Sequence, residues 1–259
     1  MIVERCFTVG LTQGRLFAKA WTPAGAELAG RPPILLFHES LGCVDLWRAF
    51  PGRLAERTGR TVIAYDRLGF GRSDPHPGRL ELDFIAAEAR QVLPVLSAQE
   101  GIGAFVACGH SVGGGMAVET AALFPDRCRG LITIAAQAFV EDQTVEGIRA
   151  AQALFEDPAM LAKLERYHGG KTRWVVDAWI DSWLSPDFAP WTLDAALTQV
   201  RCPVLALHGD GDEYGSEEHP RRIAGARGKA QILSDTGHVP HRERESLVVE
   251  AIHCFLETA

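Results

Sequence analysis

The 259-residue sequence predicts an α/β fold, with a mostly parallel central sheet flanked by helices and one inserted helical segment. Short β-rich runs alternate with longer helical patterns, as is typical of this fold class. The runs ILLF at 34–37 and VLAL at 204–207 are apolar throughout, which indicates strands buried on both faces of a parallel sheet. Between residues 137 and 200 the alternation stops and helical patterns replace it.

Eight strands are expected from short apolar and β-branched runs. The first two, at 2–9 and 15–21, are joined by a turn around Gln13 and Gly14, so they should pair antiparallel at one edge of the sheet. The other strands are expected at 33–38, 60–65, 104–108, 130–135, 203–208 and 229–234.

Five helices are expected to follow these strands, at 46–57, 80–99, 112–123, 217–226 and 243–257. The last has apolar residues at 247, 248, 251, 252 and 255, which form one stripe along a helix. Helical crossovers of this kind allow the neighbouring strands to run parallel.

The segment at 137–200 is expected to form a helical cap. It holds four of the six tryptophans: Trp174, Trp179, Trp183 and Trp191. In open α/β sheets ligands bind at the carboxyl ends of the strands, where such a segment would lie. We therefore predict a core of residues 1–136 and 201–259, a cap of residues 137–200, and a pocket lined in part by Trp179 and Trp183.

Charge and composition exclude several classes of protein. The net charge of −7 argues against a nucleic-acid partner. No apolar run approaches the length of a membrane span, and the N-terminus does not resemble a secretion signal, so we expect a cytoplasmic protein without a membrane partner. None of the six cysteines forms a C-x-x-C pair, which argues against zinc-ribbon and thioredoxin-like sites. The sequence leaves the oligomeric state open.

The candidate nucleophile is Ser111, in the run Gly109-His110-Ser111-Val112-Gly113 between a predicted strand and a predicted helix. A sharp strand-to-helix turn lifts a serine hydroxyl clear of the backbone, and flanking glycines tolerate the crowding. The helix start behind the serine supplies N–H donors and the positive end of the helix dipole.

The candidate base and acid follow later strands. A nucleophilic serine needs a base, and the base needs an orienting carboxylate. His238 follows the last predicted strand and Asp212 follows the strand at 203–208, so both should lie at the same sheet edge as Ser111. Asp210 is a rival for Asp212, and the rivals for His238 are His241 and His110, which lies beside the candidate nucleophile. His238 and His241 lack acidic or cysteine partners at ligand spacing, so we expect no metal site.

These motifs resemble those of the α/β-hydrolase superfamily, and the resemblance covers almost the whole chain. Besides the Ser111 motif, it includes the loop His38-Glu39-Ser40-Leu41-Gly42, the turn DRLGFGRS at 66–73 and the pair Gly237-His238. We interpret the turn at 66–73 as structural, because its glycines suggest tight backbone conformations.

The resemblance implies a role for each site residue. Ser111 would be the nucleophile, His238 the base and Asp212 the orienting acid, while the backbone N–H groups of Ser40 and Val112 would form the oxyanion hole. We expect Leu41 and His110 to join the pocket.

The implied reaction is hydrolysis of a small carboxylic ester through an acyl-enzyme intermediate, without a cofactor. The partner is then a small-molecule ester. Thioester hydrolysis, lactone opening and carbon–carbon bond hydrolysis remain alternatives on the same triad. A non-catalytic hydrolase-like binding protein is an alternative of a different class.

Glu39 departs from the family pattern, in which a glycine usually follows the histidine of this loop. An ionised carboxylate about 5 Å from an oxyanion opposes it by roughly 3 kcal/mol at an effective dielectric near 20. Glu39 could therefore turn away and bind backbone N–H groups or an arginine, with Arg67 and Arg72 as candidate partners. It could instead be protonated by burial, or take part in the chemistry as a fourth site residue.

Overall fold

A single eight-stranded sheet forms the centre of the computed structural model, which describes residues 1–25, 31–226 and 228–258. Residues 26–30, 227 and 259 of the predicted core lie outside the described residues. The strand order is β1-β2-β4-β3-β5-β6-β7-β8. The strands are β1 (Ile2–Leu11), β2 (Gly14–Pro23), β3 (Ile34–Phe37), β4 (Val62–Tyr65), β5 (Phe105–His110), β6 (Cys128–Ile134), β7 (Val204–Gly209) and β8 (Lys229–Leu233).

The strand directions agree with the predicted fold class. From β4 to β8 every neighbouring pair is parallel, and β1 and β2 form an antiparallel pair at one edge. β2 continues antiparallel onto β4, which joins this edge pair to the parallel strands. The carboxyl ends of β5, β7 and β8 therefore share one edge of the sheet, where Ser111, Asp212 and His238 follow them.

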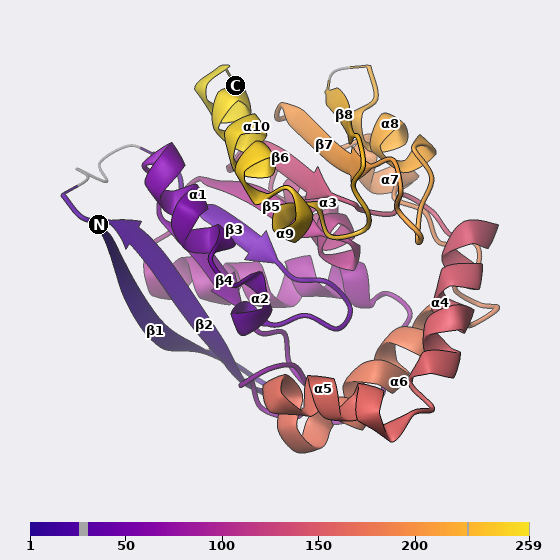
Figure 1. Ribbon diagram of the computed structural model, residues 1–259. Coiled ribbons are helices and arrows are strands. Elements are labelled where there is room, and N and C mark those ends of the chain that lie inside the picture. Colours follow the sequence, from indigo (N-terminus) through magenta and orange to yellow (C-terminus); the bar gives the residue numbers. More distant parts are fainter. Residues whose placement is uncertain (26–30, 227, 259) are drawn as a thin grey trace.

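The sheet is buried on both faces, because alternate residues of each central strand enter different hydrophobic clusters. In β3, Leu35 and Phe37 pack in one cluster, while Ile34 and Leu36 pack in the other. Figure 1 shows helices α1 (Phe50–Thr58) and α10 (Glu245–Thr258) on one face, with α2 (Phe84–Glu100) and α3 (Val112–Leu123) behind the sheet. The unbroken apolar runs of the sequence thus correspond to strands covered by helices on both sides.

Two predicted helices are broken in the structure. The helix expected at 46–57 is a short 3₁₀ turn, η1 (Val44–Trp47), followed by α1, because Arg48 takes a left-handed φ of 54° between them. The helix expected at 243–257 is preceded by a separate turn, α9 (Pro240–Glu243), before α10 begins. The helix expected at 80–99 begins only at Phe84, and the one expected at 217–226 is α8 (Glu218–Ala224).

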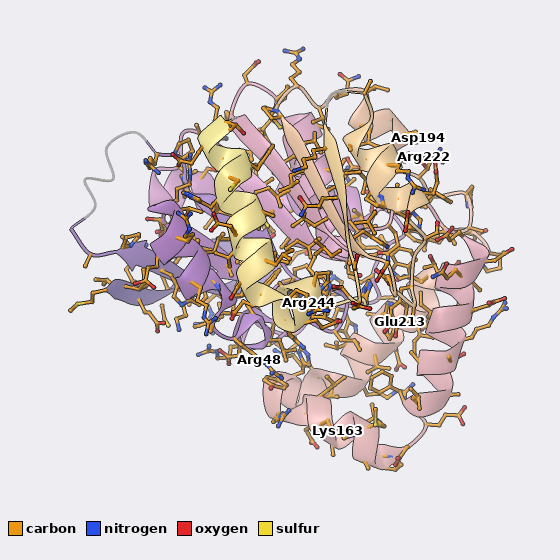
Figure 2. The ribbon with its side chains drawn as sticks, turned by 45° about the horizontal axis from the view of Figure 1, so that its top comes forward. Arg48, Lys163, Asp194, Glu213, Arg222 and Arg244 are labelled. Carbon is orange, nitrogen blue, oxygen red and sulfur yellow. The ribbon has the colours of Figure 1, made fainter. Side chains whose placement is uncertain are left out.

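The segment between β6 and β7 contains four α-helices. Figure 1 shows α4, α5 and α6 grouped at one end of the molecule and α7 beside α8. These are α4 (Asp142–Leu154), α5 (Pro158–His168), α6 (Thr172–Trp183) and α7 (Asp194–Leu197), with the 3₁₀ turn η2 (Gly169–Lys171) between α5 and α6. Figure 2 shows Asp194 beside Arg222, and their ion pair joins α7 to α8. The division into core and cap stays a prediction.

Candidate active site

Ser111 occupies a strained turn between β5 and α3. Its φ of 54° and ψ of −127° are unusual for a residue with a side chain, and such strain persists only where the surroundings enforce it. A Cβ on Gly109 would lie 1.9 Å from the carbonyl oxygen of Gly113, and a Cβ on Gly113 would lie 2.1 Å from that of Phe37. The two glycines are therefore required by backbone contacts, which explains the spacing of the motif.

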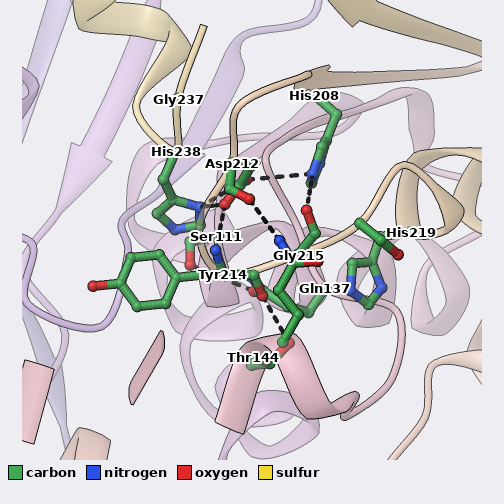
Figure 3. Close-up of polar contacts among 12 residues, drawn as sticks. Ser111, Gln137, Thr144, His208, Asp212, Tyr214, Gly215, His219, Gly237 and His238 are labelled. Atoms are coloured by element: carbon green, nitrogen blue, oxygen red, sulfur yellow. Dashed lines mark hydrogen bonds and ion pairs between the residues drawn. The ribbon is translucent and has the colours of Figure 1, made fainter. Parts of the chain in front are cut away.

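His238 and Asp212 form a direct pair. The Nδ1 atom of His238 lies 2.8 Å from Oδ1 and 2.9 Å from Oδ2 of Asp212, whose side chain is completely buried (Figure 3). Burial alone would raise the pKa of Asp212, but the bonds and charges of His238 and His208 and the N–H of Tyr214 lower it below its ordinary value. Asp212 is thus ionised and accepts a hydrogen bond from Nδ1 of His238, so Nε2 is the ring nitrogen that can accept a proton from Ser111.

Two neighbours of Asp212 were not anticipated from the sequence. The Nε2 atom of His208, at the end of β7, lies 2.9 Å from the carbonyl oxygen of Gly215 and 3.3 Å from Oδ2 of Asp212. The N–H of Tyr214 donates to Oδ1 of Asp212 at 2.8 Å, and the Tyr214 ring packs on His238. His208 and Tyr214 both lie in the run HGDGDEYG, but they contact the Asp212 carboxylate only once the turn has folded.

The rival residues lie in different surroundings. Asp210 is exposed, and its carboxylate accepts a hydrogen bond from the N–H of Thr236 at 3.2 Å. His241 is buried against Trp47 and Phe50, and burial lowers its pKa well below the ordinary value. The structure thus pairs His238 with Asp212. Within the described residues no cluster of metal-ligating side chains is present.

A pocket of about 250 Å³ connects these groups to the helical segment. Its wall combines candidate reactive residues with apolar side chains, chiefly from α4, α5 and α6. The pocket is lined by Glu39, Ser40, Leu41, Leu46, His110, Ser111, Gln137, Thr144, Ile148, Leu164, Trp179, Trp183, Tyr214, His238, Val239 and Arg242. Every side chain expected in the pocket lines it, whereas Trp174 and Trp191 do not. A larger cavity, beside Arg67 and Glu88, does not include Ser111.

The two expected oxyanion donors flank Ser111. Ser40 lines the pocket, and its N–H has no hydrogen-bond acceptor in the part of the chain that the structure describes. Val112 is the first residue of α3, so its N–H has no acceptor within the helix. Ser111 itself donates from Oγ to Oε1 of Gln137 at 3.5 Å, and Gln137 is a further polar pocket residue that the sequence did not single out.

Glu39 has partners other than the arginines expected from the sequence. Arg67 bonds only the main-chain oxygen of Glu39, at 3.2 Å, and Arg72 pairs with Asp45 instead. The Glu39 carboxylate lies 3.5 Å from Nδ1 of His110 and 3.9 Å from a terminal nitrogen of Arg242. These partners were missed because both lie far from Glu39 in the sequence.

The charge state of Glu39 follows from these contacts. Burial would raise the pKa of Glu39, but the close approach and charge of His110, together with the charges of His38 and Arg242, hold it far below the ordinary value. The lowered pKa favours an ionised carboxyl group over the reading in which burial protonates it.

The turn at 66–73 has the structural role expected. The Asp66 carboxylate accepts bonds from the N–H groups of Val44 and Arg72, and Ser73 Oγ donates to the main-chain oxygen of Asp66 at 2.6 Å. A Cβ on Gly71 would lie 2.1 Å from the Asp66 carboxylate, so glycine is required at this position.

A serine on a strand-to-helix elbow, with an aspartate–histidine pair after later strands of one sheet, is the arrangement typical of α/β hydrolases. A sequence model described as the alpha/beta hydrolase fold matches residues 32–170, which is more than half of the chain. The chain belongs to the alpha/beta hydrolase fold family.

Individual relatives are more distant. A (lyso)-N-acylphosphatidylethanolamine lipase of Bos taurus is 34% identical over 119 residues, which cover 45% of this chain and 34% of the lipase. The match thus spans about a third of that relative's length. No described helix is long and apolar enough to cross a membrane.

Solved structures share the fold over nearly the whole chain. The 2-hydroxy-6-oxo-6-phenylhexa-2,4-dienoate hydrolase of Rhodococcus sp. strain RHA1 has a TM-score of 0.81 at 17% identity and covers 99% of both chains. A thermophilic esterase of Thermogutta terrifontis has a TM-score of 0.70 at 22% identity and covers 98% of both chains. At these identities the likeness concerns the fold alone.

Proposed function

We propose that this protein hydrolyses small carboxylic esters through an acyl-enzyme intermediate. His238 takes the proton from Ser111 as Oγ attacks the ester carbonyl, and it then gives a proton to the departing alcohol. Asp212 keeps His238 in the productive tautomer and stabilises the imidazolium that forms. A water deprotonated by His238 attacks the acyl group, releasing the acid and restoring Ser111.

The single observation that carries this proposal is the contact between His238 Nδ1 and the buried Asp212 carboxylate, beside the pocket that Ser111 lines. An Asp-oriented histidine and a strained serine that line one pocket form an arrangement suited to nucleophilic attack. The N–H groups of Ser40 and Val112 are the proposed oxyanion donors, since neither is committed to a regular backbone bond.

The pocket supports a small, apolar acyl or alcohol group as the preferred substrate portion. A cavity of about 250 Å³ with Ile148, Leu164 and Trp179 in its wall favours burial of short alkyl or aryl groups. We propose that residues 137–200 act as a cap that selects the substrate.

The test is a panel of 4-nitrophenyl esters with acyl chains of graded length, assayed on the wild-type protein and on Ser111→Ala. We expect turnover of short esters by the wild type and a loss of about three to six orders of magnitude in the variant. A phosphonate ester should label Ser111 covalently, as seen by peptide mass. Full activity in a folded Ser111→Ala protein would exclude the proposal.

A further inference from the structure

Glu39 places a negative charge in the pocket, one residue before the proposed oxyanion donor Ser40. Its side chain is ionised and 20% exposed. At about 5 Å, an uncompensated carboxylate would slow a reaction with an oxyanion transition state by about a hundredfold. A working site therefore needs a nearby positive charge that offsets Glu39.

The surroundings of its two ring nitrogens identify His110 as the source of that positive charge. Nε2 of His110 lies 2.7 Å from the main-chain oxygen of His238, and a carbonyl oxygen only accepts, so Nε2 carries a proton. Nδ1 is buried, has no hydrogen-bond partner among the described residues, and lies 3.5 Å from Oε2 of Glu39. In a neutral His110 the Nδ1 lone pair would face the carboxylate and repel it. A second proton on Nδ1 turns this repulsion into an ion pair.

Other titratable groups around His110 are consistent with this state. The rings of His238 and His241 lie with centroids 5.1 and 4.6 Å from that of His110, and His241 stays neutral because it is buried. Arg242 lies on the other side of the carboxylate, 3.9 Å from Oε1 of Glu39. Among the residues that the structure describes, Glu39 is the one carboxylate that lines this pocket, so it is the counter-ion available to His110 there.

We propose that Glu39 and His110 form a buried ion pair that positions His238 and offsets the negative charge beside Ser40. This inference rests on the proposed function. His110 donates from Nε2 to the main chain of His238, so the pair holds the loop that carries the base. Glu39 keeps His110 doubly protonated, and His110 in turn neutralises Glu39. Both are positioning residues, because they act through His238 and Ser40.

The first test measures the protons of His110 without any substrate. Nitrogen NMR of protein labelled in the histidine rings should show both nitrogens of His110 protonated at pH 7, with His110→Gln used to assign the signals. In Glu39→Gln, His110 should become neutral with its proton on Nε2. An unprotonated Nδ1 in the wild type at pH 7 would overturn the ion pair, whatever the protein hydrolyses.

The second test is a cycle of two variants assayed on 4-nitrophenyl acetate. In His110→Gln, the amide nitrogen can replace Nε2 as donor, but Glu39 keeps only the charge of Arg242, 3.9 Å away, so kcat should fall by at least about tenfold with KM within about threefold. The double variant Glu39→Gln/His110→Gln removes the charge as well and should recover at least about tenfold of kcat. Glu39→Gln alone should stay within about tenfold of wild type, because neutral His110 still donates from Nε2.

His241→Gln is the matched control, because His241 is a buried histidine in the same cluster that does not contact Glu39. Adding Glu39→Gln to it should give no recovery. A double variant at 39 and 110 that is as slow as His110→Gln would refute the charge compensation. If His110→Gln does not fold, the NMR measurement on wild type and Glu39→Gln still decides the ion pair. A wild type without esterase activity would refute the proposed function alone.

Discussion

Replacing Asp212 by Asn tests how His238 is held. The Asp212 carboxylate contacts His238 Nδ1 through both oxygens, at 2.8 and 2.9 Å, and it also accepts the N–H of Tyr214 at 2.8 Å. Nε2 of His208 lies 3.3 Å from Oδ2. Two donors, His238 Nδ1 and the N–H of Tyr214, therefore bond the carboxylate through both of its oxygens, so each side of the group at this position has to be an acceptor.

The expected loss follows from that geometry. An Asn offers one oxygen and one NH₂ group, so at least one donor now faces another donor. With the NH₂ toward His238, the favoured tautomer carries its proton on Nε2 and cannot accept the proton of Ser111. Such a tautomer error costs up to about 10⁴-fold in known triads, which corresponds to roughly 5 kcal/mol of transition-state stabilisation.

Asp210→Asn is the control, because Asp210 is exposed and its one hydrogen bond, from Thr236, needs only an acceptor oxygen. We expect kcat/KM for 4-nitrophenyl butyrate to change by less than about threefold in this variant. Circular dichroism and thermal unfolding establish that both variants are folded. A folded Asp212→Asn protein within about tenfold of wild type, or a larger loss in Asp210→Asn, would refute the assignment of the acid.

Three further predictions follow from the pocket and its supports. Trp179→Ala should shift the preferred acyl length on the nitrophenyl ester panel, whereas Trp174→Ala, outside the pocket, should not. The same chain-length profile in both variants would mean that Trp179 has only a packing role. His208→Leu should lower kcat/KM by about ten- to a hundredfold, because the charge-assisted contact with Asp212 is lost. His208→Gln should retain more activity than His208→Leu, and equal losses in the two variants would exclude a donor role for His208. Burial raises the pKa of Asp66 to about 6, above its unfolded value, so protonated Asp66 contributes stability that is full at low pH and lost as pH rises through 6. Denaturant unfolding should therefore show the stability of Asp66→Asn relative to wild type rising by about 1 kcal/mol between pH 5 and 7.5, and a constant difference would contradict the raised pKa.

Most of the fold could be predicted because burial on two faces leaves a clear pattern in the sequence. The apolar run at 34–37 indicates a central strand without any knowledge of its neighbours, and β3, Ile34–Phe37, lies within the strand expected at 33–38. The breaks around Arg48 and before Glu245 were missed, because they depend on how the chain packs rather than on local preference. Pro240 was a signal for the second break, since proline favours the first turn of a helix.

In the candidate site, too, residues with a local sequence pattern could be predicted and residues placed by packing could not. Ser111, Asp212 and His238 lie at strand ends within recognisable local patterns, so they could be selected from the sequence. His208 and Gln137 have no such pattern. Gln137 contacts Ser111 only after β5 and β6 pair, and His208 contacts Asp212 only in the folded turn after β7. The partner of Glu39 was wrongly expected among nearby arginines, because His110 approaches it from a different strand.

The separation of β6 from β7 has a consequence for synthesis of the protein. β6 ends at Ile134 and its partner begins at Val204, so roughly 70 residues must be made before that edge of the sheet can pair. At about 5–20 residues per second, the β6 edge waits roughly 4 to 14 s on the ribosome. An unpaired apolar strand edge invites pairing with other chains. The length of the segment between these strands therefore sets how long the β6 edge is exposed to aggregation. We expect a longer segment to lower the yield of folded protein in cells before it alters the folded structure.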